Sequence, residues 1–365
     1  MKLTVKIRLM PDAGQAKILV AMTERFNAAA DWIAGELFAR KLSNKISAQQ
    51  VLYHEIRERF GLSSQTAILA LHRACEAYKR DKSIRPRFRK HAAITYDVRT
   101  MSFKGIDKVS LLTLSGRIIV PMVVAAYQAP RMGLSKGQCD LSRIDGKWYL
   151  FVTVDVPDGS PIEPTDFIGV DLGIANIATD SDGGQHSGKD VEAVRRKHNL
   201  QRKRLQRRNT KGANKKIRRM RDKEARFRRH ENHCISKRIV ETAKRTGRGI
   251  ALEDLTGIRQ RVTARGGDAR NRLSGWGFAQ LGAFIGYKAR LVGVPVVFVD
   301  PRNTSRTCAE CGHCEKANRK SQEKFLCKNC GHEDHADRNA ARNIRALAAC
   351  KPATELGTPP IRRAV

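Results

Sequence analysis

The sequence predicts an α/β domain in its C-terminal half, preceded by a region of β-strands that carries a block of helices. From residue 167 onward the elements follow in the order strand, strand, strand, helix, strand, helix, strand, helix, which is typical of an α/β sheet. Residues 107–157 instead alternate as paired hairpins. The stretch PDGSPIEPTD between these regions contains three prolines, so we expect a domain linker there. A length of 365 residues accommodates two or three domains.

The N-terminal half opens with a strand and three helices. Residues 2–9 alternate as a strand, and Asp12 follows Pro11 at the turn into the first helix. The apolar residues of this helix recur at helical spacing: Ile18, Met22, Phe26, Ala29, Ile33 and Leu37. Ser47 with Gln50 fits a capping box for a second helix through about Arg59. A third helix is expected over about 64–80.

The segment SIRPRFRKHAAITYDVR, residues 83–99, has two interpretations that we weigh equally. Pro86 prevents a helix, and basic residues alternate with Phe88 and Tyr96. Such a segment can follow a phosphate backbone while a ring stacks on a base. It can also be a basic edge strand whose two aromatic rings belong to the core. The strands that follow are predicted to pair through turns at Ser115-Gly116 and Asp145-Gly146.

The C-terminal half opens with FIGVDLG, a buried strand that ends in Asp171, followed by two short strands. Residues 191–247 are mostly helical, with a predicted break within Asn209–Asn214. From Arg195 to Arg229 the chain has 18 Lys and Arg residues against two acids. A density this one-sided favours contact with nucleic acid over a merely solvated helix face. A strand ending at Glu253, a helix, the buried strand PVVFVD and a last helix complete the predicted order.

Net charge restricts the partners of the chain. There are 70 Lys and Arg residues against 36 Asp and Glu, a net charge of +34 at pH 7. Such an excess repels itself unless a polyanion neutralises it, and nucleic acid is the natural candidate. No run of about 18 uncharged apolar residues and no signal peptide is found, so we expect no membrane association. The expected location is the cytoplasm of a prokaryote, with nucleoid association when the protein acts.

Four of the nine cysteines are arranged as Cys308-x-x-Cys311 and Cys327-x-x-Cys330, separated by 15 residues. This spacing predicts a four-thiolate zinc site, because two residues between thiols turn both sulfurs toward one metal. Redox-active pairs would not require two motifs at this spacing. Four thiolates leave no open coordination position, so the zinc would be structural. Substitute ligands, ranked well behind, are His313, Cys314 and His332, and the remaining cysteines are expected in the core.

Three acids stand at the ends of predicted elements: Asp171, Glu253 and Asp337. Taken singly, they could be a turn former, a surface acid and a helix cap. An α/β sheet with this element order can bring all three into one crevice. Their charges would repel one another unless a divalent cation joined them, and oxygen ligands select hard ions such as Mg²⁺. Two such ions can clamp the attacking water and the leaving oxygen of a phosphodiester.

The motifs GVDLG, IALEDL and TSRTCAECG…CKNCGHEDHADRNAARNI, in this order, resemble TnpB, the insertion-sequence-encoded RNA-guided endonuclease family related to type V CRISPR effectors. The resemblance covers about residues 167–347 closely and the N-terminal half more loosely. It implies a RuvC-like (RNase H-like) nuclease domain with an inserted zinc ribbon, and an N-terminal wedge β-barrel with a helical recognition insertion. The implied bounds are 1–10 and 85–160 (wedge), 11–84 (recognition), 167–303 and 334–349 (nuclease), 304–333 (zinc ribbon) and 350–365 (disordered tail).

The resemblance also implies residue roles and partners. Asp171, Glu253 and Asp337 become catalytic ligands of two Mg²⁺ ions; Asp337 is preferred over Asp334 because the family's pattern R-N-A-A-R-N-I follows it. Cys308, Cys311, Cys327 and Cys330 become ligands of one Zn²⁺. The implied partners are a guide RNA derived from the element end and a double-stranded DNA target.

Three alternative functions remain open at this point. The first is a DNA-binding regulator that does not cleave, although such a protein should have lost at least one of the three acids. The second is a transposase proper, which would use three acids on an RNase H-like fold for strand transfer. A structural zinc-ribbon protein, the third, would explain the charge and the cysteines but not Asp171 and Glu253.

Overall fold

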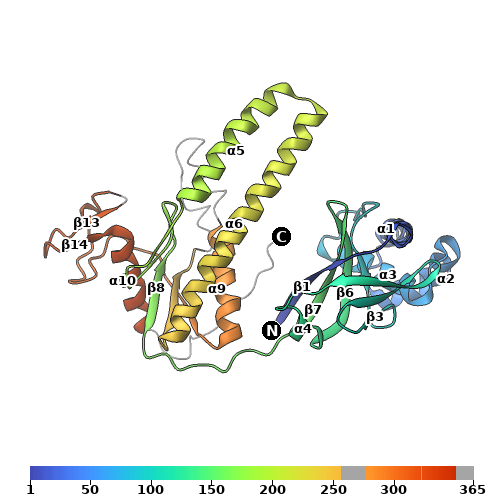
Figure 1. The fold of residues 1–365 in the computed structure, drawn as a ribbon, viewed down its shortest axis with the longest axis horizontal. Coiled ribbons are helices and arrows are strands. Elements are labelled where there is room, and N and C mark those ends of the chain that lie inside the picture. The colour runs from blue at the N-terminus through green and yellow to red at the C-terminus, as the bar shows by residue number, and fades with distance from the viewer. Residues whose placement is uncertain (256–276, 322, 351–365) are drawn as a thin grey trace. The chain divides into compact units, whose positions relative to one another are not determined.

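The computed structural model describes residues 1–255, 277–321 and 323–350, and the chain divides into two compact units, Met1–Pro157 and Asp158–Val365 (Figure 1). The division falls at the start of the predicted linker. The expected disordered tail lies almost wholly outside the described residues. None of the helices within these ranges is both long and apolar enough to cross a lipid bilayer.

The first unit is built on a seven-stranded antiparallel sheet in the order β2-β6-β7-β1-β5-β4-β3. The strands are β1 (Lys2–Leu9), β2 (Ile94–Tyr96), β3 (Met101–Lys104), β4 (Lys108–Thr113), β5 (Gly116–Val123), β6 (Ser135–Ile144) and β7 (Lys147–Asp155). Tyr96, in one edge strand, donates a hydrogen bond to the carbonyl of Leu112 in β4, beside the other edge, at 3.0 Å. The two edges therefore approach each other, and the sheet curls into a nearly closed barrel.

Helices α1 (Ala13–Ala39), α2 (Lys45–Phe60) and α3 (Ser64–Arg80) are inserted between β1 and β2, and a short α4 (Ala129–Met132) precedes β6. Asp12 and Gln15 form a capping box at the start of α1. The apolar faces of α1, α2 and α3 share one core with the barrel. Three helices inserted into a barrel agree with the order of elements expected from the sequence.

Two details of the N-terminal prediction were wrong. The second helix begins one turn earlier than expected, because Asn44, and not Ser47, accepts the capping hydrogen bond from the Ile46 amide. On α1 the buried stripe contains Leu19, while Ile18 is only half-buried. A shift of one position at the start of a stripe leaves the helical period unchanged, so the helix itself was predicted correctly.

The structure decides part of the ambiguity over residues 83–99. Tyr96 is fully buried in the barrel core and cannot stack on a bound base. Phe88 is only partly buried at the edge of the same core. The core interpretation therefore holds for Tyr96, whereas the ring of Phe88 stays partly accessible.

The second unit contains a five-stranded sheet in the order β10-β9-β8-β11-β12. Its strands are β8 (Phe167–Asp171), β9 (Asn176–Asp180), β10 (Gln185–Ser187), β11 (Gly249–Glu253) and β12 (Val296–Val299). β8, β11 and β12 run parallel, while β9 is antiparallel to β8. Helices α6 (Lys211–Arg245) and α9 (Phe278–Val292) cover one face, and α10 (Ala336–Ala349) covers the other. This is the element order that the sequence predicted.

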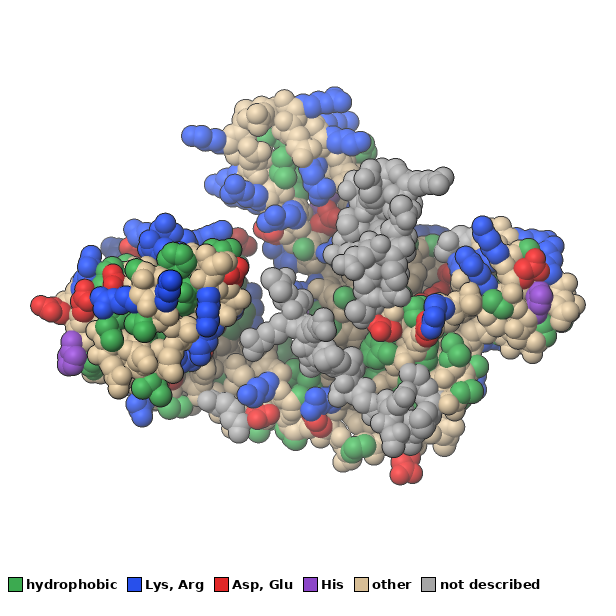
Figure 2. All heavy atoms as spheres, turned by 180° about the vertical axis from the view of Figure 1, so that it is seen from behind, with side chains coloured by type: hydrophobic (Ala, Val, Ile, Leu, Met, Phe, Trp, Pro, Cys, Tyr) green, Lys and Arg blue, Asp and Glu red, His purple; other side chains and the backbone are tan. Residues whose placement is uncertain are grey.

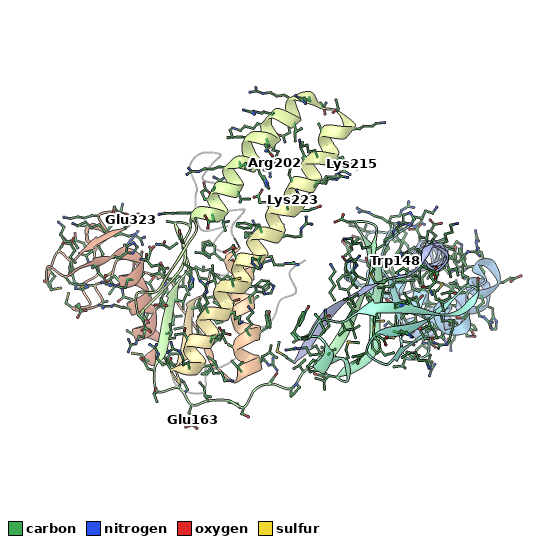
Figure 3. All side chains as sticks on the ribbon, viewed as in Figure 1. Trp148, Glu163, Arg202, Lys215, Lys223 and Glu323 are labelled. Atoms are coloured by element: carbon green, nitrogen blue, oxygen red, sulfur yellow. The ribbon has the colours of Figure 1, made fainter. Side chains whose placement is uncertain are left out.

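α5 (Lys189–Arg208) and α6 form a long antiparallel hairpin, which breaks at Asn209 and Thr210 as predicted. None of the residues of α5, all of which the structure describes, is buried, and Leu200 is 62% exposed. Polar contacts join the two helices instead: Arg202, which Figure 3 labels, approaches Glu224 at 3.3 Å. Lys and Arg side chains gather on the hairpin in Figure 2. A helix pair that buries so little apolar surface and carries so much positive charge suits a polyanionic partner.

A small module precedes α10. It contains a 3₁₀ turn η1 (Lys316–Asn318) and the two-stranded sheet β13 (Lys324–Leu326) and β14 (Glu333–His335). Phe325 is fully buried there among Cys308, Cys327 and Ala336. Because β14 leads directly into α10, the position of the module and that of the last helix are linked.

Candidate active site and zinc centre

The three predicted acids line one cleft in the second unit. Asp171 ends β8, Glu253 ends β11, and Asp337 lies in the first turn of α10. The cleft has a volume of about 310 Å³. Its other lining residues are Leu172, Gly173, Asp254, Leu255, Pro301, Thr304, Ser305 and Arg319. The predicted convergence is therefore observed, while the catalytic role of the acids stays a prediction.

Strand geometry explains this convergence. β8 and β11 are parallel neighbours, so their carboxyl ends meet at the same edge of the sheet. Side chains alternate between the faces of a strand, and Phe167 and Ala251 pack against α10. Asp171 and Glu253 follow these residues at even spacing and hence lie on the face that α10 covers. That face is where α10 presents Asp337.

A glycine allows α10 to lie close to the sheet. A Cβ added at Gly169 in β8 would lie 2.0 Å from the carbonyl oxygen of Ala341, so only glycine fits this contact. The N-cap of α10 is His335, whose Nδ1 accepts a hydrogen bond from the Asp337 amide at 3.2 Å. The interpretation of Asp337 as a helix cap is therefore wrong, and its carboxylate is available to the cleft.

Burial makes Asp171 and Glu253 difficult to ionise, and repulsion by neighbouring acids adds to this at Asp171. Burial, followed by the charges of Glu253 and Asp337, raises the pKa of Asp171 to about 8. Burial also raises the pKa of Glu253, against the effect of the Thr304 hydroxyl, which donates to Glu253 Oε1 at 2.5 Å. Asp337 is 2% exposed. A cation in the cleft would relieve this repulsion, so the site suits a bound metal.

The acids are spaced more widely than ligands of one small ion. Among the described residues, only the four cysteines form a group of potential metal ligands that lie within 4.8 Å of one another. Mg²⁺ keeps several waters and is usually held by one or two carboxylates. Two ions in a shared site lie about 3.5–4 Å apart. The spacing of the three carboxylates is therefore compatible with one ion that is held partly through water and with two ions that share the site.

Two further side chains in contact with the site were missed by the sequence analysis. Arg319, from the cysteine-containing module, donates to Asp337 Oδ1 at 3.4 Å and counteracts the raised pKa values of Asp171 and Glu253. Asn176 donates to Asp337 Oδ2 at 3.0 Å. Neither residue belongs to a motif with a recognisable spacing. The two donors fix the orientation of the Asp337 carboxylate.

The four predicted zinc ligands come together. Sγ of Cys308 lies 3.7 Å from Sγ of Cys330, and the Cys311–Cys327 distance is 3.6 Å. Tetrahedral zinc with Zn–S bonds of about 2.3 Å requires sulfur atoms about 3.8 Å apart, so the thiols fit zinc. The His313 amide lowers the pKa of the Cys311 thiol to about 6, which favours the thiolate.

The alternative ligands lie outside this group. Within the described part of the chain, His313, Cys314 and His332 do not join the four thiols. Of the other single cysteines, Cys75 and Cys139 are buried as expected, whereas Cys350 is exposed, like Cys314.

Hydrogen bonds tie the zinc centre to the acid site. Asn339 of α10 accepts a hydrogen bond from the Ala309 amide at 3.0 Å and donates one to the Thr307 carbonyl at 2.8 Å. These two bonds fix the backbone on both sides of Cys308, in the first cysteine pair. Asn343 donates to the carbonyl of Thr304 at 2.8 Å, and the hydroxyl of Thr304 holds Glu253. One helix therefore positions both sites.

Asp334 pairs with a side chain of α10 and does not line the cleft. Its side chain is fully buried and accepts from Arg338 Nε at 2.6 Å. It is absent from the cleft lining, which agrees with the preference for Asp337 over Asp334.

Acids at the ends of parallel strands, beside a module with four convergent thiols, define an α/β fold with two candidate metal sites. The structure of the mini-RNA-guided endonuclease CRISPR-Cas phi3 has a similar fold, with a TM-score of 0.60 at 11% identity over 98% of this chain and 94% of that one. The family described as "Probable transposase" matches residues 151–256, and the "Cas12f1-like, TNB domain" family matches 278–344.

Curated relatives agree with these family matches. A CRISPR-associated endodeoxyribonuclease Cas12f1 of Sulfoacidibacillus thermotolerans is 36% identical over 54% of this chain and 50% of its own. InsQ of Escherichia coli (strain K12), named as a proposed RNA-guided DNA endonuclease, is 29% identical over 81% and 77%. A TnpB-like protein of Methanocaldococcus jannaschii is 39% identical over 27% and 34%. The match thus spans half the length of that Cas12f1. The chain is therefore similar to TnpB-like proteins and to Cas12f endodeoxyribonucleases, in line with the resemblance of its motifs.

Proposed function

We propose that this chain is an RNA-guided DNA endonuclease of a transposable element, which hydrolyses phosphodiester bonds of double-stranded DNA. The observation that carries the proposal is the convergence of Asp171, Glu253 and Asp337 on one cleft. The names of Cas12f1 and InsQ support the same activity. The excess of Lys and Arg supports a resident guide RNA, derived from the element end, as the partner that neutralises the protein.

The three acids are proposed as the catalytic residues and as the ligands of two Mg²⁺ ions. When bound, such ions stabilise the attacking and the leaving oxygen of an in-line displacement. The residues of the chain supply the rest: Thr304 fixes the orientation of Glu253, while Asn176 and Arg319 fix that of Asp337.

The domain assignment is proposed with the same bounds as in the sequence analysis. The sheet with its flanking helices, 167–303 and 334–349, is taken as a RuvC-like nuclease domain. Residues 304–333 form the zinc ribbon, in which Cys308, Cys311, Cys327 and Cys330 hold one structural Zn²⁺. The barrel, 1–10 and 85–160, and the helices within 11–84 are taken as the wedge and recognition domains.

Cleavage by the purified ribonucleoprotein tests the proposal. Protein co-expressed with the element end is incubated with Mg²⁺ and a matched DNA target. Asp171→Ala, Glu253→Ala and Asp337→Ala should each abolish cutting and retain the co-purifying RNA. Asp222→Ala, at an exposed acid on α6, is the control and should cut normally. Normal cutting by any one of the three variants would remove that residue from the site.

A transposase proper is the second candidate, because the family that matches residues 151–256 is described as a probable transposase. The same three acids could then serve strand transfer. Incubation of the protein with DNA that carries the element ends, without guide RNA, separates the two functions. Joined strands would favour the transposase, and cutting that requires a matched guide would favour the endonuclease. Guide-dependent binding without cutting would indicate a regulator.

A further inference from the structure

The first unit contains a cleft that has no role in the proposed chemistry. Its volume is about 780 Å³, within the range of ligand-binding pockets. Residues of α1, α2 and the segment 85–90 line it. The lining that matters to its chemistry comprises Asn27, Trp32, Arg59, Phe60, Arg85 and Phe88.

Aromatic rings provide a stacking surface in this cleft. The ring centroids of Trp32 and Phe60 lie 5.9 Å apart, and the Arg59 guanidinium lies 5.2 Å from the centroid of the Trp32 ring. Phe88 is partly buried beside them. An arginine and aromatic rings in a basic cleft are the components with which proteins stack single-stranded bases.

Two polar atoms at the cleft have no hydrogen-bond partner in the part of the chain that the structure describes: Asn27 Oδ1 and Arg85 Nε. Asn27 is 1% exposed, and its amide nitrogen already donates to the carbonyls of Thr23 and Ala92, each at 2.9 Å. Asn27 therefore offers an acceptor and Arg85 offers a donor. A buried polar group without a partner is costly, so each atom requires a hydrogen-bonding partner, which a bound molecule can supply. The edge of a nucleobase carries donors and acceptors together.

Charged side chains at the rim of the cleft can bind the phosphate backbone that carries such a nucleobase. Glu24 lies 3.2 Å from Lys90 and 3.7 Å from His91, while Asp31 lies 3.7 Å from Arg85 and 3.9 Å from Arg87. Asp31 is thus shared by two arginines, so one positive charge at the rim is left over for phosphate. The two carboxylates can also accept from a ribose 2′-hydroxyl, which DNA lacks.

We propose that this cleft binds one unstacked nucleobase of a single-stranded RNA, with the base against Trp32 and Phe88 and the adjacent phosphates on the basic rim. The site deepens the proposed function, because it gives the RNA partner a place in the first unit. It recognises the base by stacking and by the Asn27 and Arg85 groups. Bases that present an amino group, such as adenine and cytosine, satisfy Asn27 Oδ1 best.

Ultraviolet crosslinking tests the site on the unaltered full-length protein. RNA-free protein is irradiated with a ten-nucleotide oligo(A) RNA, and the crosslinked peptides are identified by mass spectrometry. Adducts on the peptides that contain Trp32, Phe60 or Phe88 are expected. Adducts confined to other peptides, such as those of the α5–α6 hairpin, would overturn the proposal. Because no cleavage is measured, this outcome is independent of whether the protein proves to be an endonuclease.

Affinity measurements give a second test. Trp32→Ala should weaken binding of oligo(A) by about 5-fold to 100-fold, the range for loss of one base–aromatic stack. Binding of an abasic RNA of equal length should change less than twofold. Tyr127→Ala, at an aromatic residue of the same unit that is 63% exposed and outside the cleft, should match the wild type with both RNAs. Equal losses for oligo(A) and abasic RNA would refute base stacking, and an equal loss for oligo(dA) would refute the assignment of the ligand as RNA.

Discussion

Replacing Asp171 by Asn should stabilise the second unit of the magnesium-free protein while abolishing cleavage. The wild-type carboxyl group is buried beside two other acids, and its pKa is raised from 3.8 to about 8. It binds its proton more tightly in the folded state, so stability is lost as the pH rises from about 4 to about 8. Asparagine is nearly isosteric and carries no charge. The variant should therefore lack this loss.

The size of the effect follows from the pKa difference. At pH 7 the solution lies about three units above the ordinary pKa of Asp171, and each unit corresponds to about 1.4 kcal/mol, which gives an upper limit of about 4 kcal/mol. At pH 5 the limit is about 1.5 kcal/mol. Local relaxation reduces such limits, so we expect a gain of about 1–3 kcal/mol at pH 7. For a unit of this size that corresponds to a rise in Tm of about 3–10 °C.

Differential scanning calorimetry of zinc-loaded, magnesium-free protein at pH 5, 7 and 8 measures the effect. The Tm difference between Asp171→Asn and wild type should grow with pH, and added Mg²⁺ should raise the Tm of the wild type only. Asp222→Asn, at an exposed acid of the same unit, should show no pH-dependent gain. A Tm gain that is absent, or equal at all three pH values, would refute the argument that Asp171 is destabilised by burial and by its acidic neighbours.

Three more predictions concern the surroundings of the acids. Cys327→Ser should lower the zinc content measured by mass spectrometry and impair cleavage, whereas Cys314→Ser, outside the thiol group, should leave one zinc per chain. Arg319→Ala should lower the cleavage rate by about 100-fold without loss of bound RNA, because a charge that contacts the acids is removed; an unchanged rate would exclude a role. Gly169→Ala should destabilise the second unit by about 1–3 kcal/mol in calorimetry, since α10 must move away from β8, while Gly212→Ala, in open space on a helix, should be neutral or stabilising.

Helices and strands with a strong local pattern could be predicted from the sequence. The residue at which each of them begins was harder to predict. The helix expected over about 64–80 agrees with the observed α3, Ser64–Arg80. At the start of α2, Asn44 and Ser47 are both capable of capping and lie one turn apart, and the local pattern does not choose between them. Tyr96 illustrates a similar limit, because an alternating basic segment does not reveal which of its rings the barrel will enclose.

The acid site was predictable because its members stand where the topology must bring them together. Parallel neighbours end at one edge of a sheet, so Asp171 and Glu253 follow from the element order alone. Arg319 could not be found in this way, since it lies in the loop between the cysteine pairs and reaches Asp337 only through the fold of that module. The cleft at Trp32 depends on contacts between α1, α2 and residues 85–90, which no local pattern encodes.

The connection between the cysteine module and the acids has a physical consequence for the acid site. Carboxylates that repel one another would separate if the backbone allowed it. Asn339 fixes one side of this helix to the first cysteine pair, and Gly169 lets the other side contact β8 directly. Asn343 and Thr304 extend the same restraint to Glu253. With zinc bound to the four thiols, as proposed, the module would hold the acids at a spacing they would not keep by themselves, so that binding of a divalent cation, rather than movement of the helix, would relieve their repulsion.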